Sequence, residues 1–157
     1  MPQIPLHYVD LRTFCYATED EKRVEEALRT FLPGSDDDAD DADDTEPFEI
    51  ERVESDGHFG DRILVLSARI ESADDVRYVL SRLADLESFD TLIGELDERV
   101  TENTELFLRL DKQAAFGGDV KLGDGITFRG KVEAYPAKKE KAVANAEDVL
   151  TQLRDDE

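Results

Sequence analysis

Two segments in the last third of the chain alternate strictly between apolar and polar side chains. The segment 105–111 reads ELFLRLD, with leucine at every second position, and the segment 125–135, GITFRGKVEAY, alternates in the same way. A period of two is typical of a β-strand with one buried face. Antiparallel sheets commonly leave one face open to solvent, whereas parallel sheets are covered on both faces. The pattern therefore predicts a largely antiparallel sheet that is packed on one side.

Three further segments have the composition of strands, because they are rich in β-branched and aromatic residues. They read HYVDLRTFCYA at 7–17, FEIERVE at 48–54 and RILVLSARI at 62–70. Asp56 and Gly57 lie between the last two segments and form a strong hairpin-turn signal. We therefore expect these two strands to pair with each other.

Apolar stripes at helical spacing predict helices at 18–32, 72–86, 88–100 and 137–154. Thr18, followed three residues later by Glu21, fits the capping box that begins a helix. Ser72 is the expected cap of the second helix. Gly94 lowers helix stability, so the third helix is expected to be short. Strands and helices in this order predict a two-layer α+β sandwich, with helices packed on one face of the sheet.

The length of 157 residues is typical of a single domain, which we expect to span 1–157. One segment inside it, SDDDADDADDTEP at 35–47, offers no side chain to bury. We interpret it as a disordered acidic loop. A calcium site is the alternative, but the segment has neither the EF-hand spacing nor its central glycine.

The chain is strongly acidic, with 40 acidic and 19 basic residues and a formal charge of −21. Such an excess repels itself at ordinary ionic strength and is screened in molar salt. The pattern resembles proteins of salt-accumulating halophiles and predicts a haloarchaeal cytoplasm, with an acidic mesophilic protein as the alternative. Neither a membrane-spanning run nor a signal peptide is expected, which again favours a cytoplasmic location.

The motifs of the common enzyme classes are absent from the sequence. It contains no Gly-x-Ser-x-Gly elbow, no Walker A loop and no Gly-x-Gly-x-x-Gly fingerprint. Cys15 is interpreted as a buried apolar residue, and His7 and His58 have no partner pattern for catalysis or zinc. The glycine-rich stretch FGGDVKLGDG is interpreted as a long hairpin connection. We expect no catalytic residue, no metal and no cofactor.

One part of the chain departs from this acidity. The segment 109–141 holds eight basic and five acidic residues, and six of the seven lysines of the protein. Cationic side chains mixed with aromatic rings suit RNA, because the charges contact phosphates and the rings stack on bases. The alternative is a network of cross-strand ion pairs among Arg109, Asp111, Lys131 and Glu133. The expected RNA-binding residues are Phe107, Arg109, Lys112, Gln113, Lys121, Arg129, Lys131, Tyr135, Lys138 and Lys139.

Three stretches of the chain resemble an archaeal family of predicted RNA-binding proteins, also described as predicted exosome subunits. They read HYVDLRTFCYATEDEKRVEEALRTFLP, SDGHFGDRILVLSARI and LFLRLDKQAAFGGDVKLGDGITFRGKVEAYP. The resemblance extends from Tyr8 to about Lys141, and its most specific parts are RTF-YATEDE, GH-G and RLDKQAA--G. It implies a sandwich similar to the fifth large-subunit ribosomal protein and no catalytic residues. The acidic insertion at 35–46 departs from the family pattern.

Two functions remain open at this point. The first is a non-catalytic RNA-binding protein, accessory to RNA processing or to an exosome-like assembly, whose partners are RNA and subunits of that assembly. The second is a protein-interaction subunit that does not touch RNA, with a homodimer as one form. An open, cationic outward face on the strands at 105–111 and 125–135 favours RNA, whereas a covered face favours the interaction subunit.

Overall fold

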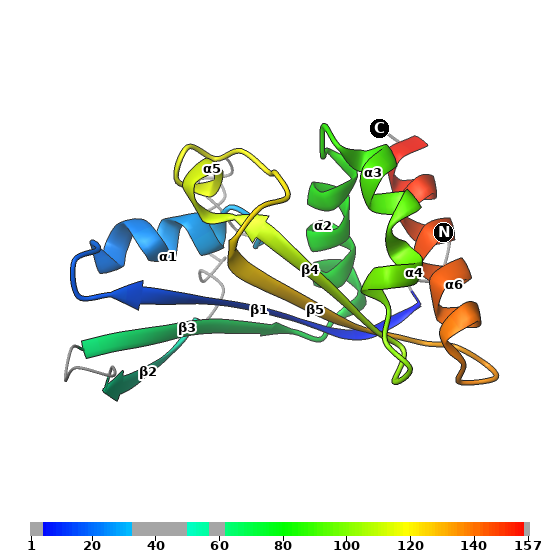
Figure 1. The fold of residues 1–157 in the computed structure, drawn as a ribbon, viewed down its shortest axis with the longest axis horizontal. Coiled ribbons are helices and arrows are strands. Elements are labelled where there is room, and N and C mark those ends of the chain that lie inside the picture. Colours follow the sequence, from blue (N-terminus) through cyan, green and yellow to red (C-terminus); the bar gives the residue numbers. More distant parts are fainter. Residues whose placement is uncertain (1–4, 33–49, 57–61, 156–157) are drawn as a thin grey trace.

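The computed structural model describes residues 5–32, 50–56 and 62–155, and these form a five-stranded antiparallel sheet covered by helices on one face (Figure 1). The strands lie in the order β2-β3-β1-β5-β4. Their bounds are Leu6–Tyr16 for β1, Glu51–Asp56 for β2, Arg62–Ile70 for β3, Glu105–Asp111 for β4 and Gly125–Val132 for β5. The predicted α+β sandwich is confirmed, and the longest strand, β1, lies at the centre of the sheet.

The helices of the described chain all lie on the same side of this sheet in Figure 1. Their bounds are Glu21–Arg29 for α1, Ala73–Ala84 for α2, Phe89–Gly94 for α3, Leu96–Arg99 for α4, Lys112–Phe116 for α5 and Lys139–Asp155 for α6. Side chains from the inner face of the sheet pack against these helices, and Leu11 of β1 and Phe128 of β5 are fully buried there. The core therefore occupies one side of the sheet only.

The helix boundaries correct one prediction and confirm two. Asp20, not Thr18, caps α1, and its side chain accepts a hydrogen bond from the backbone N–H of Lys22. Ser72 caps α2 as expected, accepting from the N–H of Asp75 at 3.2 Å. The helix predicted to be short ends at Gly94, and the chain continues as the separate four-residue helix α4.

The connection between β4 and β5 also differs from the prediction, because it contains α5 instead of a plain hairpin loop. Asp111 begins this helix by accepting a hydrogen bond from the N–H of Ala114 at 3.0 Å. The chain then folds back so closely that a Cβ on Gly125 would lie 2.5 Å from the Cβ of Lys112. Gly125 also has a φ of +113°, which residues with side chains rarely adopt.

The pairing of β2 with β3 is antiparallel, as expected for a hairpin, with Asp56 opposite Arg62. The turn residues Gly57 and His58, and the acidic segment 35–47, lie outside the described residues. No helix in the described ranges is long and apolar enough to cross a membrane.

Candidate nucleic-acid interface

The side of the sheet that faces away from the helices carries no covering element in the described chain (Figure 1). We call the outward-pointing positions of the five strands the open face. Its cationic residues are Arg12, Arg69, Arg109, Arg129 and Lys131, and its acidic residues are Asp10, Glu51, Glu105 and Asp111. This surface is therefore locally cationic, although the whole chain carries a charge of −21.

Strand register aligns these side chains in rows across the sheet. In one row Arg69 of β3 lies opposite Asp10 of β1, Asp10 lies opposite Arg129 of β5, and Arg129 lies opposite Phe107 of β4. The next row along β1 contains Ser67, Arg12, Thr127 and Arg109. Because directly opposed residues have Cβ atoms about 4.5–5.5 Å apart, neighbours in a row are within contact distance.

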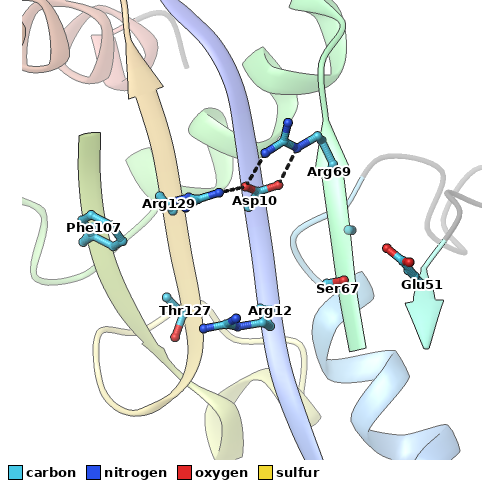
Figure 2. A pocket seen from close by; sticks show the side chains of 9 residues that line it. Asp10, Arg12, Glu51, Ser67, Arg69, Phe107, Thr127 and Arg129 are labelled. Carbon is cyan, nitrogen blue, oxygen red and sulfur yellow. Dashed lines mark hydrogen bonds and ion pairs between the residues drawn. The ribbon is translucent and has the colours of Figure 1, made fainter. Parts of the chain in front are cut away.

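Asp10 connects two of the arginines through charge-assisted hydrogen bonds (Figure 2). Arg69 donates from Nε to Oδ1 at 2.9 Å and from Nη2 to Oδ2 at 3.0 Å, and Arg129 donates from Nη2 to Oδ2 at 2.6 Å. Partial burial alone would raise the pKa of the Asp10 carboxyl, but the hydrogen bonds from both arginines outweigh burial and hold the pKa below its usual range. Asp10 is therefore a carboxylate that keeps both guanidinium groups in place.

Tyr8 supports the same two arginines from the next outward position of β1. The guanidinium carbon of Arg69 lies 4.1 Å from the centre of the Tyr8 ring, and that of Arg129 lies 5.8 Å from it. Both distances are within the range of a cation–π interaction. The arginines on either side of β1 are thus restrained by a carboxylate and a ring together.

Arg12 has a different environment from its two neighbours. It is exposed, and its guanidinium carbon lies 5.8 Å from the centre of the Phe14 ring. Within the described ranges it forms no ion pair with a carboxylate. Arg12 therefore presents a guanidinium that no carboxylate of the described residues neutralises, on the central strand of the open face.

A depression of about 850 Å³ lies over these rows. Figure 2 shows Phe107 at one side, the Arg129–Asp10–Arg69 bridge across one end, and Arg12 and Thr127 across the other. Ser67, Ala68 and Glu51 complete its lining. The depression combines guanidinium groups, hydroxyls and one exposed aromatic ring, which are the groups that contact phosphates, sugars and bases in nucleic-acid complexes.

The structure brings four of the predicted RNA-binding residues together on the open face: Phe107, Arg109, Arg129 and Lys131. Phe107 is 37% exposed. Arg109 pairs with Asp124 at 3.2 Å, and the Nζ of Lys131 donates a hydrogen bond to the carbonyl oxygen of Asn103. Of the four, Phe107 and Arg129 line the depression.

Lys112 is placed elsewhere, with its ammonium group directed at the end of β1. Its Nζ donates to the carbonyl oxygen of Phe14 at 2.6 Å and to Oε1 of Glu19 at 2.9 Å. Its side chain is only 12% exposed. Partial burial raises the pKa of Glu19, but the Lys112 hydrogen bond and a backbone N–H outweigh burial and lower that pKa overall. This environment is that of a structural ion pair.

The remaining predicted residues lie outside the five strands. Gln113 belongs to α5, and Lys121 belongs to the connection that follows it. Tyr135, Lys138 and Lys139 lie where β5 leads into α6, and Tyr135 is 89% exposed. None of these five residues lines the depression to which Phe107 and Arg129 belong.

The alternative ion-pair network is not the one that the structure contains. Arg109 pairs with Asp124, Glu133 lies 3.3 Å from His7, and Asp111 caps α5. Asp124 reaches Arg109 because the connection between β4 and β5 folds back on the end of the sheet, whereas Glu133 meets His7 because β1 pairs with β5.

Sequence reasoning missed the outward residues of β1 and β3, above all Asp10, Arg12 and Arg69. The alternation that exposes them is visible in the sequence, since Val9 and Leu11, on either side of Asp10, are fully buried. The missing information was the position of β1 between β3 and β5, which places Asp10 within reach of arginines 59 and 119 residues away.

The described residues contain no group of three or more histidine, cysteine or carboxylate side chains arranged to hold a metal ion. Cys15 is buried, and burial, with the charge of Glu19 next, raises the pKa of its thiol.

Together, the fold and the open face define a two-layer α+β protein with an uncovered sheet surface that carries arginines and aromatic rings. The chain belongs to the family described as RNA binding, whose model matches residues 8–132. It is 37% identical over 147 residues to the RNA-binding protein PAB1135 of Pyrococcus abyssi, covering 90% of this chain and 91% of that protein. It is 28% identical over 145 residues to the uncharacterized protein MJ0213 of Methanocaldococcus jannaschii, covering 87% and 92% respectively.

Solved structures support the same family. Mth689 from Methanothermobacter thermautotrophicus, described as a DUF54 protein, is 37% identical, with a TM-score of 0.74 over 92% of this chain and 98% of that chain. Protein AF2318 from Archaeglobus fulgidus, also a DUF54 protein, is 27% identical, with a TM-score of 0.76 over 92% and 99%. The likeness to the fifth large-subunit ribosomal protein stays a prediction.

Proposed function

We propose that this protein binds RNA through the open face of its sheet and that it does so as a non-catalytic accessory protein. The observation that carries the proposal is the grouping of Arg12, Arg69 and Arg129 with the exposed ring of Phe107 in one depression. The name of the family and that of the Pyrococcus abyssi relative support the same ligand.

The charge distribution agrees with a local binding surface. A polyanion is repelled by most of a protein with a charge of −21, so it can approach only where cations exceed carboxylates. The open face meets that condition, and its arginines carry planar guanidinium groups that suit phosphate oxygens. In molar salt, counterion release contributes little, and hydrogen bonds and stacking would supply more of the affinity.

RNA titration of charge-reversed variants tests this function. We expect Arg12→Glu to weaken the binding of RNA extracted from the same cells at least tenfold, because it removes a guanidinium of the depression that has no carboxylate partner among the described residues. Lys22→Glu on α1 is the matched control, since it changes the net charge equally on the helix side of the molecule. RNA binding that is absent in the parent, or equally affected by the two variants, would contradict the proposal.

An accessory role in an RNA-processing or exosome-like assembly is the finer part of the proposal and is supported by the family resemblance. A tagged protein should recover such an assembly from its own cell extract, and nuclease treatment of the extract distinguishes RNA-mediated from direct association.

The alternative, a protein-interaction subunit, has one specific observation in its favour. Phe14, Tyr16 and Val53 are exposed on the strands β1 and β2, at 39%, 51% and 51%. If this apolar group is an interface between two copies, the molar mass in solution will be that of a dimer, and Val53→Asp will convert it to a monomer.

A further inference from the structure

We infer that the RNA accepted by the open face is single-stranded, with an unpaired nucleotide in the depression whose phosphate lies on Arg12 and whose base stacks on Phe107. This inference rests on the proposed function and names the class of RNA that the same surface takes.

Arg12 is the phosphate contact because its neighbours are already engaged. Asp10 holds Arg69 and Arg129, so their charge is partly neutralised, whereas Arg12 is exposed and has no carboxylate partner in the described chain. Charge-assisted hydrogen bonds from a guanidinium to phosphate oxygens are among the strongest available to a protein surface.

Two hydroxyl groups complete the surroundings of Arg12. Ser67 on β3 and Thr127 on β5 lie directly opposite Arg12, one on each side, and both line the depression. Neither side chain forms a hydrogen bond in the described part of the protein. Hydroxyls of this kind contact phosphate and sugar oxygens in nucleic-acid complexes. Among the described residues, the row therefore places a guanidinium without a carboxylate partner between two hydroxyls without hydrogen bonds.

Phe107 supplies a surface on which an unpaired base can stack. Its ring stands at the side of the depression in Figure 2, opposite Arg129 in the β4–β5 register. An aromatic side chain stacks on bases that are splayed out of a helix, whereas bases inside a duplex are covered by their neighbours. Since the ring is 37% exposed on an otherwise apolar-in, polar-out strand, stacking would cover surface that the fold leaves in water.

Charge and size point to the same class of RNA. A duplex carries two strands of phosphates along one axis, so it brings about twice the negative charge per unit length to a protein whose own charge is −21. The row from Phe107 to Arg69 crosses four neighbouring strands, about 14 Å at about 4.8 Å per spacing. A surface of that width suits the two or three unpaired bases that sheet-based RNA-binding domains stack.

The test compares two forms of one RNA. A fluorescein-labelled strand of about ten nucleotides, containing only adenine and cytosine in mixed order so that it cannot pair with itself, is titrated alone and after annealing to its complement. We expect the full-length protein to bind the single strand at least tenfold more tightly than the duplex. Tighter or equal binding of the duplex overturns the inference and leaves the proposed function standing.

Three variants separate stacking from folding. Phe107→Leu keeps an apolar side chain on β4 but removes the ring, and we expect it to weaken single-strand binding by about fivefold to a hundredfold. Phe107→Tyr retains the ring and should bind like the parent, while Lys22→Glu serves as the distant control. An unchanged affinity of Phe107→Leu in a protein that still melts cooperatively overturns the stacking part of the inference. Failure to bind the strand, the duplex and total RNA alike would contradict the proposed function itself.

Discussion

The carboxylate of Asp10 on β1 lies 2.6 Å from Nη2 of Arg129 on β5, in the middle of the open face. The same carboxylate receives two hydrogen bonds from Arg69 on β3, so one side chain joins three adjacent strands. These bonds restrain two guanidinium groups that line the candidate RNA site. Asp10 thus contributes both to the stability of the sheet and to the shape of the binding surface.

Replacing this carboxylate should lower stability in a pH-dependent way. We expect Asp10→Asn to reduce the free energy of unfolding by about 1–2 kcal/mol at pH 7, a modest value because both arginines are more than a third exposed and solvent screens the pair. The pKa of Asp10 is lowered in the folded state, so its contribution is complete above the unfolded value of about 3.9 and is lost as pH falls through the folded pKa.

Chemical denaturation of the parent and of Asp10→Asn between pH 7 and pH 3 measures the difference in their free energies of unfolding. We expect this difference to become smaller as the pH approaches 3. Asp124→Asn is the matched control, because the Asp124 side chain is 84% exposed and its carboxylate pairs with Arg109. A difference between parent and Asp10→Asn that stays constant down to pH 3 would show that the carboxylate charge is not responsible.

Lys112 should behave as a structural residue when it is substituted. Lys112→Met removes the hydrogen bonds to Phe14 and Glu19 and leaves a partly buried carboxylate without its partner. We expect the free energy of unfolding to fall by about 1–3 kcal/mol, with RNA affinity of the folded protein little changed. The control is Lys121→Met, at an exposed lysine of the following connection. A large loss of RNA affinity with unchanged stability would instead return Lys112 to the interface.

Two glycines should respond to alanine in opposite directions. Gly125→Ala forces a side chain into a φ of +113° and within 2.5 Å of the Cβ of Lys112, so we expect a loss of about 2–4 kcal/mol in unfolding free energy. Gly94→Ala adds a Cβ with no atom within 4 Å at the end of α3, so it should be neutral or stabilising by up to about 1 kcal/mol. Chemical denaturation of both variants measures these two changes in unfolding free energy. An unchanged stability of Gly125→Ala would contradict the close approach of Gly125 to Lys112 at the start of α5.

Stability should rise with salt if the protein is adapted to a salt-rich cell. Forty acidic side chains against 19 basic ones repel one another, and raising KCl from about 0.1 M to about 1 M shortens the Debye length from about 10 Å to about 3 Å. We therefore expect the melting temperature to increase by several degrees across this range. A melting temperature that does not change with KCl would exclude the halophile interpretation.

The sequence by itself determined the strands and the longer helices, though not the short helix α5, and the side of each strand that is buried. Alternation in β4 and β5 was enough to separate Leu106 and Phe128 from Phe107 and Arg129, because strand geometry sends successive side chains to opposite faces. The Ser72 cap and the break at Gly94 were equally readable, since both effects are local. The Thr18 cap was misplaced by two residues because Asp20 offers the same chemistry closer to the first turn.

Only the tertiary structure decided which side chains share a surface. Nothing in the local pattern of β1 shows that it lies between β3 and β5, so the pairing of Asp10 with Arg69 and Arg129 could not be read from the chain. Lys112 was grouped with nearby basic residues by sequence, but the structure directs its ammonium group toward Glu19, in the turn between β1 and α1. Strand order and chain reversal depend on contacts between residues distant in sequence, and those contacts, rather than local propensity, determine where charges meet.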